Sequence, residues 1–159
     1  MTFSLDKIDL EILGLMQDNA RISNADMARE LGMAPSAVLE RVKKLEQKKV
    51  IRQYVTDIDP AALGQKLLAF ISLKTSDGLG CNVTGAKLAQ IPEVQEVHSI
   101  AGEDCFLVKV RTTDSASLIR LMRTSFSEVT SIIATKTTIV LETVKEQQHL
   151  IIPKPEQDE

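Results

Sequence analysis

The stretch Leu31–Ile51, LGMAPSAVLERVKKLEQKKVI, decides how the first third of this 159-residue chain folds. Its apolar residues Val38, Val42 and Leu45 recur at intervals of four and three, which is the spacing of a buried stripe on a helix. Pro35 fits the first helical position, where the missing backbone N–H has no intrahelical partner to lose. The stretch therefore predicts a helix that begins near Pro35 and buries one side.

Two further helices are expected before this one. Ser4 or Asp6 can cap the first, whose apolar pattern ends near Asn19. Ser23 can cap the second, and Gly32 fits the left-handed residue that ends a helix. A helix, a short glycine-containing turn and another helix are typical of a helix-turn-helix.

Positive charge is concentrated between Arg41 and Arg52, where six residues are Lys or Arg and one is Glu, although the formal charge of the chain is -3. Duplex DNA carries one charge per ~1.7 Å of its axis, so a locally basic helix matters more for DNA binding than net charge does. Taken alone, the run is better explained as a solvated helix end whose lysines suit the helix dipole. The helix-turn-helix context reverses that preference and favours DNA.

The hydrophobic pattern changes near residue 53 from helical to strand-like. Five short segments, rich in β-branched residues, suit strands: QYVTDID, LLAFISLKT, VQEVHSIAG, CFLVKVRTT and ATKTTIVLETV. Helices are expected from about Val83 to Gln90 and from a cap at Asp114 or Ser115. From LLAFISLKT onward the order is β-α-β-β-α-β, which predicts a ferredoxin-like α+β sandwich with two helices on one face of an antiparallel sheet.

Composition and patterning divide the chain into domains. The 43% apolar content is enough to build a core in each of two small domains. No stretch predicts a signal peptide or a membrane span, so we expect a cytoplasmic protein. The predicted parts are a winged helix-turn-helix domain at 1–52, a connector at 53–64, the ferredoxin-like domain at 65–147 and a polar tail at 148–159.

The sequence offers little support for a metal site, a cofactor or a catalytic centre. Cys81 and Cys105 fit no metal-ligand spacing and are interpreted as reduced structural thiols. Asp6, Asp9 and Glu11 form an acidic cluster at a helix start, where carboxylates suit the positive end of the helix dipole. We therefore expect no metal, no cofactor and no catalytic pair.

Two stretches together resemble the Lrp/AsnC family of leucine-responsive and feast/famine transcription regulators. One is LDKIDLEILGLMQDNARISNADMARELGMAPSAVLERVKKLEQKKVI, Leu5–Ile51, and the other is SIAGEDCFLVKV, Ser99–Val110. The resemblance covers about residues 4–146. It implies a transcription regulator whose first domain binds duplex DNA and whose βαββαβ domain senses amino acids and assembles a homodimer, with four dimers often closing into an octamer.

The residues expected to contact DNA lie at the start of the second helix and along the third. Near base edges or phosphates we expect side chains of the third helix, and the following lysines are expected nearer the DNA backbone. Two departures from the family pattern bear on this helix, because Ala34 replaces a common Ser cap and Lys49 replaces a common Gly. The candidate DNA-binding residues are Ser23, Asn24, Pro35, Ser36, Ala37, Glu40, Arg41, Lys43, Lys44 and Lys48.

The resemblance also implies an effector site at the turn between the second and third strands of the ferredoxin-like domain. Family members often show Gly-Asp-Tyr-Asp in this turn, where this chain has Gly102, Glu103, Asp104 and Cys105, so one acidic side chain sits one place away from its common position. Threonines on the last strand would be supplied across the subunit interface. The candidate effector-binding residues are Gly102, Glu103, Asp104, Cys105, Thr135 and Thr137.

Assembly and two alternative functions complete the expectations. Paired sheets are expected to bury alternate apolar residues such as Phe70, Ile71, Phe106, Val108, Ile139 and Leu141. The first alternative is an enzyme subunit, because some tetrapyrrole (sirohaem) decarboxylases are similar to this pair of domains. The second is an effector-sensing scaffold with a vestigial DNA module. The basic third helix favours a DNA-binding regulator over both.

Overall fold

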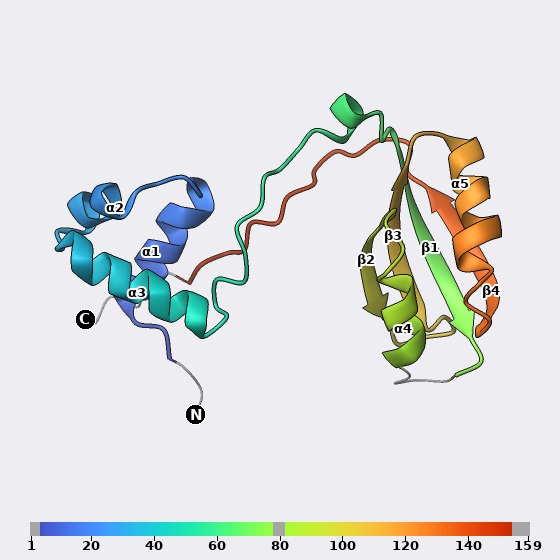
Figure 1. Cartoon of the computed structure of the whole chain (residues 1–159), viewed down its shortest axis with the longest axis horizontal. Helices are drawn as coiled ribbons and strands as arrows, with labels where there is room; N and C mark the ends of the chain where they lie inside the picture. The colour runs from blue at the N-terminus through green and yellow to red at the C-terminus, as the bar shows by residue number, and fades with distance from the viewer. Residues whose placement is uncertain (1–3, 78–81, 154–159) are drawn as a thin grey trace. The chain divides into compact units, whose positions relative to one another are not determined.

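The computed structural model describes residues 4–77 and 82–153, and it contains two compact units. The first unit comprises Met1–Asp57 together with Glu146–Glu159, and the second comprises Ile58–Lys145. Figure 1 follows the chain from the helices of the first unit to the sheet of the second and back again. The chain therefore passes between the units twice. The segment predicted as a polar tail thus groups with the first unit.

Three helices form the first unit: α1 (Lys7–Asp18), α2 (Asn24–Leu31) and α3 (Pro35–Gln47). Ile12 of α1, Met27 of α2 and Leu45 of α3 are almost fully buried and belong to one apolar cluster. Val38 and Val42 of α3 belong to the same cluster, as their spacing predicts. The small core is thus built from one stripe of each helix.

The local sequence explains where these helices begin and end. Asp6 caps α1, accepting from the Asp9 amide at 2.8 Å, while the Asp9 side chain accepts from the Asp6 amide at 3.3 Å. Ser23 caps α2, and Gly32 ends it with φ 64°. Ala34 makes no side-chain cap at the start of α3, which confirms the expected loss. Side-chain caps therefore explain where α1 and α2 begin, and a left-handed glycine explains where α2 ends.

The end of α3 keeps a left-handed residue although no glycine is present. Lys49 has φ 58°. Its amide donates to the Glu46 carbonyl at 2.9 Å, and the Val50 amide donates to the Leu45 carbonyl at 2.9 Å. This pair of bonds is the Schellman arrangement, with Val50 packing beside the apolar cluster. The backbone requirement of the turn therefore persists, and a lysine occupies it under strain.

The prediction that QYVTDID forms a strand is wrong. Within residues 4–57 and 146–153 the structure contains no strand. A lone β-branched segment has no partner strand in the first unit, so its backbone cannot complete a hydrogen-bonded ladder. The next ordered element is a short 3-10 helix, η1 (Pro60–Leu63), which Asp59 caps.

The second unit is a four-stranded antiparallel sheet covered by two helices on one face (Figure 1). The strands are β1 (Leu67–Thr75), β2 (Val94–Ser99), β3 (Phe106–Thr112) and β4 (Ile132–Ile139), in the spatial order β2-β3-β1-β4. The helices are α4 (Asn82–Leu88) and α5 (Ser115–Leu121), and a π turn, η2 (Met122–Phe126), extends α5. The predicted ferredoxin-like α+β fold is confirmed.

The register of the sheet decides which apolar residues face the helices. Ile71 lies opposite Val108, and Leu73 lies opposite Phe106. All four are buried in one cluster with Leu88 of α4 and residues of α5. The expectation that Ile71, Phe106 and Val108 are buried between subunits is therefore wrong. These side chains fill the core of a single subunit.

A substitution at the end of α3 tests the strained turn. Lys49→Gly should raise the free energy of unfolding by about 1 kcal/mol, because glycine adopts a positive φ without a Cβ clash. Lys48→Gly is the matched control, since Lys48 has φ -80° and glycine there gains nothing. Chemical denaturation of both variants measures the difference, and equal stabilities would contradict the account.

Candidate nucleic-acid interface and effector turn

The surface of α3 opposite the buried stripe is polar and exposed. With 3.6 residues per turn, residues 36, 40, 43, 44 and 47 project away from Val38, Val42 and Leu45. Ser36, Glu40, Lys43, Lys44 and Gln47 are all exposed. Gln47, which is not among the candidate contacts, also lies on this face, as its helical position alone indicates.

The candidates near the start of α2 and α3 have mixed surroundings. The Ser23 hydroxyl accepts from the Asp26 amide at 3.0 Å and donates to the Asp26 carboxylate at 2.6 Å. Asn24 and Ala37 are half-buried, whereas Pro35 is exposed. The Ser23 side chain is thus already engaged in capping α2.

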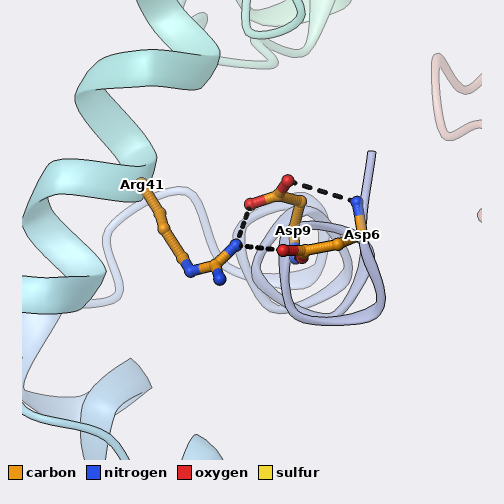
Figure 2. A network of polar contacts seen from close by, with 3 residues as sticks. All are labelled: Asp6, Asp9 and Arg41. Carbon is orange, nitrogen blue, oxygen red and sulfur yellow. Dashed lines mark hydrogen bonds and ion pairs between the residues drawn. The ribbon is translucent and has the colours of Figure 1, made fainter. Parts of the chain in front are cut away.

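Arg41 is held inside the first unit by two carboxylates. Figure 2 shows its side chain extending from α3 to the start of α1. The same Nη1 atom lies 2.7 Å from Asp6 Oδ2 and 2.7 Å from Asp9 Oδ1. The Arg41 side chain is 30% exposed and the Asp9 side chain only 9%. Arg41 therefore ties α3 to α1 in this structure, whatever contact it makes with DNA.

The electrostatics of this cluster follow from its hydrogen bonds. The Asp9 backbone amide, and then the Arg41 guanidinium, lower the pKa of Asp6 below its ordinary value. Hydrogen bonds from Asp6 and Asp9 likewise raise the pKa of Arg41. The acidic cluster at the start of α1 is thus both a helix cap and the anchor of a cation from α3.

A second polar contact joins the segment after α3 to that helix. The Tyr54 hydroxyl donates to the Glu46 carboxylate at 2.8 Å. Burial, together with the neighbouring Glu46, raises the pKa of Tyr54 to about 12. The residues that leave the first unit are thus fixed to the end of the helix.

The candidate effector turn lies at one end of the sheet, between β2 and β3. Gly102 has φ 152°, a conformation that residues with a side chain rarely adopt. The Cys105 amide donates to the Leu73 carbonyl of β1 at 2.7 Å. Leu73 in turn pairs with Thr135 of β4. The turn and Thr135 therefore flank the same β1 residue, separated by two strand spacings of about 4.8 Å each.

The candidate effector residues differ in exposure. Glu103, Thr135 and Thr137 are exposed, whereas Asp104 and Cys105 are half-buried. β4 is an edge strand, and its residues from Ile133 to Ile139 are exposed. Within one subunit, Thr135 and Thr137 thus present their hydroxyl groups to solvent.

Thr75 is a residue near the turn that the sequence analysis missed. It is buried at the end of β1, and its hydroxyl has no hydrogen-bond partner among the described residues. The thiol of Cys105 lies 3.9 Å from the Thr75 carbonyl oxygen. Thr is common in strands, so no local pattern indicates that this hydroxyl would be unpaired.

A shallow hollow of about 270 Å³ lies elsewhere on the second unit. Thr112, Thr113, Arg120 and Thr124 are among the residues that line it. None of the candidate effector residues takes part in it.

In the described ranges, no cluster of three or more side chains could hold a metal ion, and no helix is long and apolar enough to cross a membrane. Cys81 lies outside the described residues.

Comparison with known protein families identifies both units. Residues 5–52 match the model of the winged helix-turn-helix DNA-binding domain, and residues 68–150 match that of the Lrp/AsnC ligand binding domain. The chain belongs to the Lrp/AsnC family. Its DNA-binding and ligand-binding domains are in the order that the sequence predicts, so it is a transcription regulator of this family.

Individual Lrp/AsnC relatives match along nearly the whole chain. The leucine-responsive regulatory protein of Haemophilus influenzae is 32% identical over 151 residues, covering 94% of this chain and 91% of that protein. The solved structure of Escherichia coli AsnC matches with a TM-score of 0.85 and 26% identity, covering 95% of this chain and 100% of that one. A Neisseria meningitidis transcriptional regulator, solved as an L-Met complex, matches with a TM-score of 0.84 and 26% identity, over 93% and 97% of the two chains.

The tie between α1 and α3 predicts two kinds of DNA-binding variant. Arg41→Ala should lower the free energy of unfolding by about 1–3 kcal/mol, because it removes charged hydrogen bonds and leaves Asp9 buried. It should leave the slope of log K against log salt unchanged. Lys44→Ala should instead flatten that slope by roughly 0.9 if Lys44 neutralises one phosphate. Lys7→Ala, an exposed lysine of α1, is the control.

Fluorescence anisotropy with duplex DNA at several salt concentrations measures these slopes. A slope that falls in Arg41→Ala by as much as in Lys44→Ala would show that Arg41 leaves its carboxylates to bind phosphate.

The lowered pKa of Asp6 predicts an acid sensitivity. Because the pKa of Asp6 is lower in the folded chain than in the unfolded one, its contribution to stability is present above the unfolded value of about 3.9 and is lost as pH falls through the folded value. Asp6→Asn should therefore weaken the fall in stability below about pH 4. Denaturation at pH 7 and at lower pH, with the exposed Asp18→Asn as control, tests this.

Proposed function

We propose that the chain acts as a homodimer that binds duplex DNA through α3 and responds to an amino acid bound at the Ala101–Cys105 turn. Two features support it most. The DNA-binding domain has an exposed basic face on α3, and the ligand-binding domain has a sharp acidic turn between β2 and β3.

On the DNA side, α3 offers side chains for both groove and backbone. Ser36 and Glu40 lie on the same outward face as Lys44, where a recognition helix contacts base edges. Lys43 and Lys48 are exposed lysines suited to phosphates. A two-fold dimer should read two related half-sites about 34 Å apart, one helical turn of DNA.

The second unit leaves apolar surface for assembly. Ile139 is 47% exposed and Leu141 is 99% exposed, at and beyond the end of the edge strand β4. The sheet face away from the helices carries half-buried Phe70 and Leu107, because their neighbours Ile71 and Val108 point the other way. An open sheet edge and an uncovered face both favour pairing with a second copy. We propose a homodimer, with octamers as a higher assembly.

The effector chemistry follows from the turn. An amino acid carries an ammonium and a carboxylate on adjacent atoms, so its site needs acidic or carbonyl acceptors beside backbone N–H donors. Glu103 or Asp104 can accept from the ammonium, while Gly102 lets backbone N–H groups approach the carboxylate. We propose that Thr135 and Thr137 of a second subunit complete the site, and that the effector side chain is apolar. The L-Met complex of the Neisseria relative supports this class.

The tetrapyrrole decarboxylase alternative receives less support. The Haemophilus influenzae relative is named a leucine-responsive regulatory protein, and the Neisseria meningitidis one a transcriptional regulator. The outward face of α3 also retains Lys43 and Lys44, which a tetrapyrrole enzyme would not need. Incubating the purified protein with sirohaem and recording its absorption spectrum distinguishes the two functions.

A thermal-shift screen of the common amino acids should identify the effector. A ligand at one hundred times its Kd stabilises the native state by about 2.7 kcal/mol. Asp104→Ala and Thr137→Val should each weaken binding of the amino acid that is found, without changing operator affinity in its absence. Thr138→Val is the matched control, because Thr138 pairs with Phe70 and points to the opposite face of β4. If both test variants bind the amino acid with the wild-type affinity, the site lies elsewhere.

The assembly has its own test in sedimentation. The full chain at tens of micromolar should run as a dimer or a larger species, and Ile139→Lys should shift it toward monomer. Ile119→Lys, an isoleucine of α5 that is 52% exposed, should leave the assembly unchanged. A wild-type monomer at this concentration would contradict the proposal.

A further inference from the structure

The residues after β4 return to the DNA-binding unit. Residues from Glu146 onward group with Met1–Asp57 rather than with the sheet that precedes them. Figure 1 shows this C-terminal segment running from β4 to the neighbourhood of α1. We call its described part, residues 146–153, the strap.

The side chain of Gln17 in α1 binds the backbone of the strap. Gln17 Nε2 donates to the Leu150 carbonyl at 2.7 Å, and the Leu150 amide donates to Gln17 Oε1 at 2.9 Å. A primary amide offers a donor and an acceptor side by side, so it can satisfy both polar groups of one extended residue. The contact therefore recognises an extended backbone rather than a particular side chain.

Gly14 provides the space beside this contact. It lies one helical turn before Gln17 and on the same side of α1. A Cβ at position 14 would lie 3.9 Å from Ile152 Cδ1, so alanine would fit but a longer side chain would meet the strap. Ile152 is the half-buried residue of the strap, while Leu150 and Ile151 are exposed. A glycine inside a helix is destabilising relative to alanine, and the strap gives a reason to keep this position small.

We propose that the Gly14–Gln17 face of α1 is a docking site for an extended peptide segment, and that its occupant is the strap of the same chain. The docked strap forms a second tether between the units. The first tether is the segment that crosses at Asp57 and Ile58, and the second crosses at Lys145 and Glu146.

The second tether starts from β4. The strand that carries Thr135 and Thr137 ends at Ile139, and the docked Leu150 lies eleven residues later. That length spans at most about 40 Å when fully extended. A unit held at two points explores fewer orientations than a unit on one flexible linker, because each closed contact limits the other. The strap therefore restricts how the DNA-binding unit is presented. This consequence rests on the proposed function.

Hydrogen exchange of the full-length protein tests the docking directly. Amides of residues 146–152, read by mass spectrometry, should exchange more slowly than in an unstructured peptide. Gln17→Ala should speed that exchange roughly tenfold, because it removes both hydrogen bonds that hold the Leu150 backbone. Gly14→Leu should do the same by blocking Ile152. Gln148→Ala, an exposed strap residue, is the matched control.

The outcomes of the exchange experiment separate clearly. Fast exchange of the segment in wild type, or unchanged exchange in both Gln17→Ala and Gly14→Leu, would overturn the docking site. Mixed oligomers of isotope-labelled and unlabelled chains show which copy supplies the strap. Cross-links between α1 and the strap that join labelled to unlabelled chains would overturn docking within the same chain.

DNA binding tests the role of the strap as a tether. Wild type should prefer one spacing of two half-sites over spacings altered by a few base pairs, and Gln17→Ala should reduce that preference at least roughly threefold. Affinity for a single half-site should stay unchanged in this variant. An unchanged spacing preference would overturn the tether. If the wild-type protein binds no DNA at all, the proposed function fails, while hydrogen exchange still decides the docking site.

Discussion

Burial of one stripe on α3 is the constraint on which the DNA-binding unit depends. Val38, Val42 and Leu45 fill a core that only three short helices supply, so α3 cannot rotate without exposing them. The same burial fixes the direction of the opposite face, which carries Lys43 and Lys44. The basic run is therefore displayed outward because the apolar run is held inward, although the chain as a whole is acidic.

Polar contacts add to the small core in holding the segments of the first unit together. The Arg41 guanidinium joins α3 to the capped start of α1, and the Gln17 amide joins α1 to the C-terminal segment. Tyr54 joins the segment after α3 to Glu46. A core of this size offers few apolar contacts. Hydrogen bonds between distant parts of the chain therefore contribute much of what holds the helices of the first unit in place.

The ligand-binding unit follows a different principle, because its sheet has two unlike faces. One face is closed by α4 and α5 over residues such as Ile71 and Val108, while the other face and the β4 edge remain open. Alternation along a strand tells which residues share a face. It does not tell which face the helices cover, so the pattern alone cannot separate core residues such as Ile71, Phe106 and Val108 from interface residues.

The sequence by itself determined the helices, the order of the strands along the chain and the family, because these depend on local chemistry and on spacing. Ser23, Gly32 and Pro35 each mark a boundary through their own hydrogen bonds or backbone preference. The sequence allows either Ser4 or Asp6 as the cap of α1, and the structure selects Asp6. Only the tertiary structure decided the partner of Arg41, the irregular path of QYVTDID and the docking of Leu150 on Gln17. Each of these joins groups far apart in sequence, or needs a missing strand partner, and no local pattern encodes such a contact.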